Sequence, residues 1–110
     1  MRVMAIDEVS ASELESALAS GARLYDVRET DEYEAGHVPG AVLIPLGTVA
    51  ENVDAFRGDG LTYVICKSGG RSMKACEILA GNGLDAVNVA GGTMGWMSSG
   101  RATVAGDRPA

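Results

Sequence analysis

The sequence predicts a single α/β domain with a central, mainly parallel β-sheet and helices on both of its faces. Three observations indicate this class. The chain has 110 residues, which suffices for one hydrophobic core but not for two. Short apolar runs alternate with amphipathic segments along it, and brief glycine-marked turns join them. Alternation of this kind is typical of parallel sheets, in which each helix carries the chain back across the sheet.

Composition and charge narrow the classes of function. Hydrophobic residues make up 46% of the chain and charged residues 22%, the balance of a soluble globular protein. The formal net charge of −6 argues against nucleic acid and membrane partners, because both need clustered Lys and Arg. The opening residues turn acidic too early for a signal peptide, and no apolar window approaches the length of a membrane span. We therefore expect a cytoplasmic protein with reduced cysteines.

The first quarter of the chain predicts a capped helix and then a strand. Ser10 is placed to cap a helix over residues 10–20, with Glu13 at the position of a capping-box carboxylate. Gly21 is expected to end this helix. Residues 22–27 contain an aromatic and a β-branched residue in an apolar run, and they predict the first clear strand.

Residues 28–56 are predicted to contain a short helix, a second strand and a further helical segment. Thr30 is a candidate cap for the short helix, and the glycines and proline of 36–40 predict a turn after it. Residues 41–45 form an apolar run that predicts a strand. Hydrophobic residues then recur at near-helical spacing over 46–56.

The second half of the chain repeats the alternation around two further strands. Residues 61–66 are the most strand-like run present, and an amphipathic helix is predicted after them, with Gly81 as its stop. Residues 85–90 predict the last strand. Residues 91–100 predict a short final helix.

The end of the chain gives no periodic signal. Residues 101–110 lack a hydrophobic period and end in polar residues, so this tail is expected to fray. No internal repeat or linker interrupts the sequence. One domain is therefore predicted over 1–110, with a core of about 5–100.

The loop after residues 61–66 joins a cysteine to glycines and basic residues. Cys66 ends the predicted strand, and reactive groups collect at the carboxyl ends of parallel strands. A helix begins just after the loop, so its unpaired backbone N–H groups are expected to point into the loop. Glycine permits a tight curl, and serine can donate to a thiolate or an oxyanion. The predicted anion-binding residues are Lys67, Ser68, Gly69, Gly70, Arg71 and Ser72.

Two interpretations of Cys66 compete: a buried small side chain at a strand end, and an activated nucleophile. A thiol attacks only as the thiolate, which the helix N-terminus, Lys67 and Arg71 would stabilise. A core cysteine has no need of such a loop, so the sequence favours a reactive thiol that solvent can reach. Cys76 lies on the apolar face of the next helix and is instead expected in the core, with no disulfide to Cys66.

Three segments in this order resemble the rhodanese family of sulfurtransferases: YDVRETDEYEAGHVPGAVLIP, then VICKSGGRS, then VAGGTMGW. The resemblance covers roughly residues 5–100 and implies a five-stranded sheet. It also implies a thiosulfate sulfurtransferase, in which Cys66 takes a sulfane sulfur from a thiosulfate-like donor and carries it as a persulfide. A second nucleophile would remove that sulfur: cyanide in an assay, and a thiol or a sulfur-relay protein in the cell. No cofactor is implied.

The resemblance also assigns supporting residues. Asp26 and Arg28 match the family's D-x-R signature and are expected to tie neighbouring loops by an ion pair. His37, the single histidine, is expected to fix a loop rather than act as a base. Two cysteines and one histidine, far apart in sequence, do not predict a metal site.

Three alternative functions remain open. The same domain could be a sulfur carrier or docking module that works only with a partner. Cysteine phosphatases of similar fold place five residues between cysteine and arginine, whereas CKSGGR has four, and the smaller loop favours sulfur over a phosphoryl group. A thiol redox sensor is the third alternative.

Overall fold

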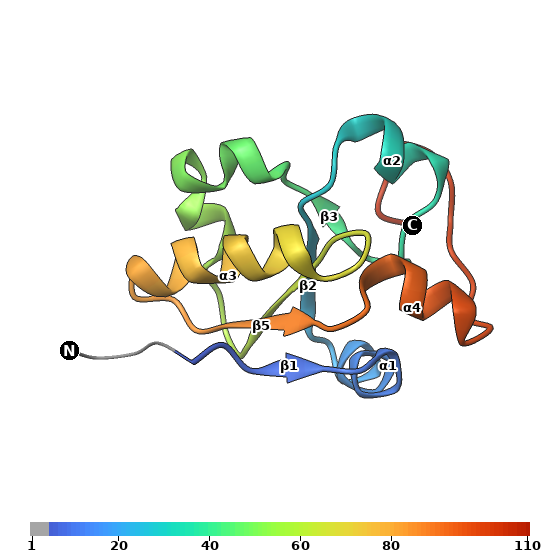
Figure 1. Cartoon of the computed structure of the whole chain (residues 1–110), viewed down its shortest axis with the longest axis horizontal. Coiled ribbons are helices and arrows are strands. Elements are labelled where there is room, and N and C mark those ends of the chain that lie inside the picture. The colour runs from blue at the N-terminus through green and yellow to red at the C-terminus, as the bar shows by residue number, and fades with distance from the viewer. Residues whose placement is uncertain (1–4) are drawn as a thin grey trace.

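The computed structural model describes residues 5–110 and contains a five-stranded sheet with helices on both sides (Figure 1). The strands lie in the order β1-β5-β4-β2-β3, and each neighbouring pair is parallel. The predicted α/β class is therefore confirmed, together with the five strands that the resemblance implies. The strands are β1 (Glu8–Val9), β2 (Arg23–Asp26), β3 (Val42–Leu43), β4 (Thr62–Ile65) and β5 (Ala86–Val89).

Helical segments form wherever the sequence predicts helix, and all of them except the last, α4, connect two strands. The segment 46–56, with its near-helical spacing, forms two short 3-10 helices. Within residues 5–110, no helix has the length and apolar character needed to cross a membrane. The helices are α1 (Ala11–Ala19), α2 (Thr30–Ala35), η1 (Leu46–Glu51), η2 (Val53–Phe56), α3 (Gly70–Gly81) and α4 (Gly92–Ser98).

Hydrogen bonds confirm the predicted start of α1 and correct that of α2. The Ser10 hydroxyl accepts from the backbone N–H of Glu13, and the Glu13 carboxylate accepts from that of Ser10, which completes a capping box. Thr30 is not the cap of α2 but its first residue. The backbone N–H of Glu29 donates to the Glu32 carboxylate at 3.0 Å, so an acidic side chain satisfies this end of the helix.

Side chains at the end of β4 alternate between two hydrophobic clusters, one on each face of the sheet. Ile65 belongs to the cluster that contains residues of α1, α2 and α4. Val64 and Cys66 belong to the opposite cluster, which contains Ala75, Cys76 and Leu79 of α3. The side chain of Cys66 therefore points to the face covered by the helix that follows its own loop.

Strand β1 has no counterpart among the strands predicted from residue patterns. It is two residues long and stands directly before the cap of α1. Two residues cannot display an alternation of buried and exposed side chains, so the pattern gives no signal. The strand exists because Glu8 and Val9 pair with Asn88 and Val89 of β5. This pairing places Glu8 beside Asn88.

The tail 101–110 does not fray as the sequence analysis expects. Val104 pairs with His37 in an antiparallel bridge, with N···O distances of 2.9 Å in both directions. Gly40 donates to the Pro109 carbonyl, and Gly106 donates to the Glu34 carbonyl. These bonds join segments about seventy positions apart in the chain, which a local pattern cannot predict.

Candidate active site

Cys66 stands at the centre of the sheet, directly after β4, which lies between β5 and β2. The loop that follows it leads into α3 and passes between α2 and α4 (Figure 1). The structure thus places the predicted nucleophile at the carboxyl end of a central parallel strand. Two hollows in the described surface lie away from Cys66. Leu61, at the opposite end of β4, lines both of them.

Two hydrogen-bond donors lie within reach of the sulfur of Cys66, one in its loop and one in the first turn of α3. The backbone N–H of Gly69 donates to Sγ at 3.1 Å, and the Ser72 hydroxyl lies 3.3 Å from it. Burial raises the pKa of the thiol, but hydrogen bonds from the Ser72 hydroxyl and from the amides of Ser72, Gly69 and Ser68 together outweigh burial. The pKa of Cys66 is therefore lowered, and a thiolate is favoured here.

The sulfur of Cys66 is buried beneath its loop rather than exposed to solvent. Cys66 is only 1% exposed, whereas Lys67, Ser68 and Gly70 are exposed above it. This differs from the solvent-reachable thiol that the sequence analysis expects. The difference arises because the loop curls over the sulfur to bring Gly69 and Ser72 within hydrogen-bonding distance. In this structure solvent therefore has almost no contact with Cys66.

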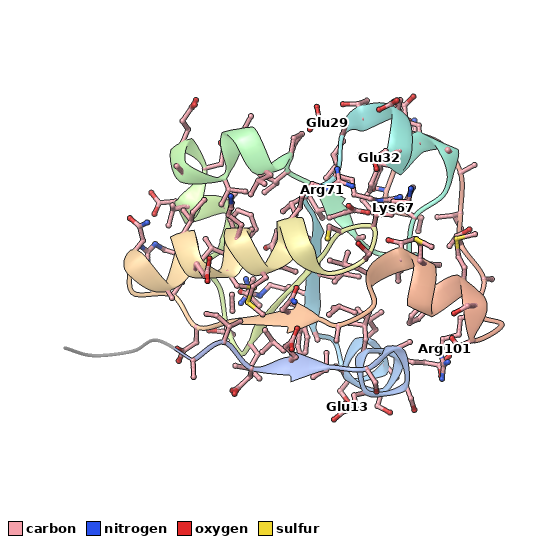
Figure 2. All side chains as sticks on the ribbon, viewed as in Figure 1. Glu13, Glu29, Glu32, Lys67, Arg71 and Arg101 are labelled. Atoms are coloured by element: carbon pink, nitrogen blue, oxygen red, sulfur yellow. The ribbon has the colours of Figure 1, made fainter. Side chains whose placement is uncertain are left out.

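The two predicted cations differ in their surroundings. Arg71 forms a bidentate ion pair with Glu32 of α2, with N···O distances of 2.7 and 2.9 Å (Figure 2). The hydrogen bond from Arg71 is the largest cause that lowers the pKa of Glu32 to about 2. Lys67 is exposed and makes no ion pair within residues 5–110. Backbone amides and a hydroxyl are thus the leading groups that lower the pKa of the thiol, while the charges of Arg71 and Cys66 also attract each other.

Two glycines allow the loop to adopt this shape. Gly69 has a φ of +111°, in the left-handed region, and it immediately precedes α3. Gly92 has a φ of +60°, and a Cβ there would lie 2.5 Å from the Lys67 carbonyl oxygen and 2.6 Å from that of Cys66. The backbone of α4 therefore approaches the loop too closely for any side chain at position 92.

The start of α4 fixes the backbone of the loop. The N–H of Thr93 donates to the Cys66 carbonyl at 2.8 Å, and the Thr93 hydroxyl donates to the same oxygen at 3.0 Å. The N–H of Met94 donates to the Lys67 carbonyl at 3.0 Å. The glycine pair before Thr93 is a sequence signal of close backbone approach, but these contacts were not predicted from it.

Ser72 has a second partner that the sequence analysis also missed. Its hydroxyl lies 2.5 Å from Oδ1 of Asn88, a residue of β5 that is 1% exposed. Asn88 Nδ2 donates to the Glu8 carboxylate at 2.8 Å and to the Gly69 carbonyl at 3.1 Å. The site thus extends from the thiol through Ser72 and Asn88 to the edge strand β1.

Asp26 ends β2 and Arg28 follows it, and the two side chains form a buried ion pair with Nη2 and Oδ2 2.8 Å apart. Arg28 also donates to the Gly36 carbonyl at 2.9 Å, which ties the end of β2 to the loop after α2. His37 follows that loop and is fully buried. Its ring nitrogens face the carbonyls of Tyr33 and Arg108, and neither partner belongs to the loop of Cys66.

Cys76 is buried like Cys66, but the pKa of its thiol is shifted in the opposite direction. It is fully buried in the cluster under α3, and burial is the largest cause that raises its pKa to about 12. Both cysteines are free thiols. Among residues 5–110, no group of three or more His, Cys, Asp or Glu side chains is arranged to hold a metal ion.

Comparisons with known proteins agree with this geometry. The protein-family model of the rhodanese-like domain matches residues 10–99 of this chain. The protein YtwF of Bacillus subtilis (strain 168) is 39% identical over 95 residues, which cover 84% of this chain and 92% of YtwF. Thiosulfate sulfurtransferase GlpE of Pseudomonas entomophila (strain L48) is 34% identical over 82 residues, covering 74% of this chain and 75% of GlpE.

A solved structure gives the same result for the fold. The crystal structure of a rhodanese-like domain protein from Staphylococcus aureus superposes with a TM-score of 0.77 at 36% identity. The match covers 83% of this chain and 91% of that one. With its five parallel strands and the cysteine loop after β4, the chain belongs to the rhodanese-like domain family of sulfurtransferases.

Proposed function

We propose that the chain is a thiosulfate sulfurtransferase that carries sulfur as a persulfide on Cys66. The Cys66 thiolate attacks the outer sulfur of thiosulfate, the S–S bond of the donor breaks, and sulfite leaves with the bonding electron pair. A nucleophile then attacks the outer sulfur of the persulfide, and the Cys66 thiolate leaves. With cyanide the product is thiocyanate, and with a thiol it is a new persulfide.

One observation carries this proposal: the sulfur of Cys66 accepts hydrogen bonds from Gly69 and Ser72, which lower the pKa of the thiol. The same donors suit both steps, because the sulfur is a thiolate when it attacks and again when it leaves. The name of GlpE, which assigns it thiosulfate as donor, supports thiosulfate here. The exposed side chain of Lys67, in the loop after Cys66, offers a positive charge to an incoming anionic donor.

Thiocyanate formation from thiosulfate and cyanide tests the proposal. Wild type, Cys66→Ser and Cys76→Ser are compared at equal concentration, with phosphatase activity toward p-nitrophenyl phosphate measured in parallel. We expect Cys76→Ser to retain activity and Cys66→Ser to lose it. Activity in Cys66→Ser, or phosphatase activity in place of sulfur transfer, would overturn the assignment.

A second candidate function is a sulfur carrier that needs a partner protein to open its loop. The 1% exposure of Cys66 favours it, because a partner could supply the free energy that displaces the loop. A carrier would form a stoichiometric persulfide with thiosulfate but turn over slowly with cyanide. Rapid turnover of both small molecules would exclude the need for a partner.

A further inference from the structure

The hydroxyl of Ser72 has one proton and three acceptors within reach. Cys66 Sγ and the Gly69 carbonyl oxygen each lie 3.3 Å from Ser72 Oγ, and Asn88 Oδ1 lies 2.5 Å from it. A serine hydroxyl can donate only one hydrogen bond at a time, although its lone pairs can accept others. The sulfur and the asparagine therefore compete for the same proton.

The orientation of the Asn88 amide is fixed by its other partners. Nδ2 lies 2.8 Å from the Glu8 carboxylate and 3.1 Å from the Gly69 carbonyl, and both of these groups can only accept. A rotated amide would set Oδ1 against these two oxygens. Oδ1 must therefore face Ser72, and it does so at a residue that is 1% exposed, where no solvent replaces a lost hydrogen bond.

We propose that Asn88 is a positioning residue that holds the Ser72 proton whenever the Cys66 sulfur is uncharged and releases it when that sulfur becomes a thiolate. In the thiol, the S–H donates to Ser72 Oγ and the Ser72 hydroxyl donates to Asn88 Oδ1. When the thiol loses its proton to solvent, the hydroxyl turns and donates to Sγ. Asn88 thus opposes ionisation of the thiol, while Ser72 favours it.

This exchange gives the hydrogen bond a role in each half of the reaction, a consequence that rests on the proposed function. In the persulfide, the negative charge lies on the outer sulfur and Sγ is bonded on both sides, so the Ser72 proton returns to Asn88. As the acceptor removes the outer sulfur, charge develops on Sγ and the proton turns toward the leaving thiolate. The donor is therefore free when the charge appears.

Charged and titratable groups around the sulfur define the background of any titration. Glu32 neutralises Arg71 and Asp26 neutralises Arg28. Burial keeps Cys76 neutral, because its pKa is raised to about 12. The groups around the site are Lys67 on the loop, Arg71 and Cys76 on α3, Glu32 on α2, Glu8 on β1, Asp26 at the end of β2 and Arg28 after it. Because Glu8 contacts Asn88, the experiment must separate the effect of the Glu8 charge on the thiol from the effect of the Asn88 amide.

The test is the pH profile of the rate at which iodoacetamide alkylates Cys66, measured in wild type, Asn88→Leu, Ser72→Ala and the double variant, each with Cys76→Ser. Removing the nearest competing acceptor leaves only the Gly69 carbonyl oxygen, at 3.3 Å, in competition with the sulfur for the Ser72 proton. We expect Asn88→Leu to speed alkylation at the acidic end of the profile by roughly three- to tenfold, the value of one hydrogen bond. Ser72→Ala should slow it.

The double variant decides whether Asn88 acts through Ser72. We expect Asn88→Leu to have no accelerating effect when Ser72 is already alanine. An equal acceleration in both backgrounds, or none in either, would overturn the proposal. Alkylation needs no sulfur donor, so this result is independent of whether the protein uses thiosulfate.

A second pair of variants keeps the test valid if Asn88→Leu fails to fold. Glu8 is exposed, and Glu8→Gln removes its charge but keeps an oxygen that can accept from Asn88 Nδ2. Glu8→Ala removes both the charge and the acceptor, so the amide is held less firmly. We expect Glu8→Ala to speed acidic alkylation more than Glu8→Gln. Equal profiles for the two variants would contradict the role of amide orientation.

Discussion

Arg71 at the start of α3 and Glu32 of α2 form a bidentate ion pair across 39 positions of sequence. Both side chains are partly exposed, at 36% and 29%. Figure 2 shows them facing one another near Lys67 at the loop of Cys66. The carboxylate of Glu32 therefore offsets the positive charge of Arg71 at the place where an anionic donor would enter.

Removing the charge of Glu32 should improve the binding of an anion at this loop. For Glu32→Gln we expect the KM for thiosulfate to fall by about two- to fivefold with little change in kcat, because Arg71 is no longer neutralised. For Arg71→Gln we expect the KM to rise, because the carboxylate is then unpaired. Steady-state kinetics at low ionic strength measure both.

Glu29→Gln is the matched control for this charge change. Glu29 lies at the start of the same helix and is exposed, but its carboxylate has no contact with Arg71. The Glu29→Gln substitution removes the same unit of negative charge from the surface of the molecule as Glu32→Gln does. A KM that falls equally in Glu29→Gln and Glu32→Gln would assign the effect to net charge and contradict a specific role of the pair.

The same ion pair gives the stability of the fold a defined pH dependence. The pKa of Glu32 is lowered from 4.5 to about 2, chiefly by the hydrogen bond from Arg71. A carboxyl whose pKa is lower in the folded state stabilises the fold above its unfolded pKa and loses this effect as the pH falls. The contribution should be complete above pH 4.5 and vanish near pH 2. Because the pair is partly exposed, we expect about 1 kcal/mol or less.

Urea unfolding of wild type and Glu32→Gln across this pH range measures that contribution. The free energy of unfolding of the variant should be lower at neutral pH, and the two proteins should converge in acid. A difference that stays constant down to pH 2 would show that the glutamine perturbs packing rather than an ion pair.

Local patterns predicted most of the fold. The capping box of Ser10 and Glu13, the apolar run before Cys66 and the amphipathic face of α3 each express their structure within about a dozen residues. The class of the sheet followed from their order. The same reasoning placed Cys66 at the end of a strand and before a helix, which is where the structure has it.

The parts that could not be predicted depend on contacts between distant segments. Ser72 and Asn88 are 16 positions apart, Arg71 and Glu32 are 39 apart, and Asn88 and Glu8 are 80 apart. Each pair exists because the packing of strands and helices brings its members together. Burial of the thiol is likewise set by how the loop curls against neighbouring elements, so the sequence indicated a more open sulfur than the structure has.

Gly92 should be the least replaceable glycine near the site. A Cβ at this position would overlap the carbonyl oxygens of Cys66 and Lys67, and its φ of +60° adds backbone strain. We expect Gly92→Ala to lower the free energy of unfolding by more than the roughly 1 to 2 kcal/mol that a left-handed alanine costs. Urea unfolding measures this.

Two other glycines serve as controls. Gly91 has a φ of +79°, but a Cβ there meets no atom closer than 3.6 Å, so Gly91→Ala should cost only the backbone term. Gly81 is in α3 with open space around it, so Gly81→Ala should be neutral or stabilise by up to about 1 kcal/mol. The explanation is wrong if Gly92→Ala is no worse than Gly91→Ala.

His37 should hold the C-terminal tail in place. Its ring nitrogens lie 2.8 Å from the Tyr33 carbonyl and 2.7 Å from the Arg108 carbonyl. We expect His37→Ala to speed hydrogen exchange at the amides of Val104 and Gly106 by about tenfold, because the tail loses a buried anchor. Exchange at Val27, which donates to the Ile65 carbonyl, is the internal control. Equal acceleration at all three amides would indicate global destabilisation instead.

The central claim is that Cys66 itself carries the transferred sulfur, and the intact mass of the protein tests it most directly. Reduced wild type is treated with excess thiosulfate, separated from it and weighed, then treated with cyanide and weighed again. We predict a gain of one sulfur atom that cyanide removes, in wild type and Cys76→Ser but not in Cys66→Ser. A stable gain in Cys66→Ser, or none in wild type, would contradict the account.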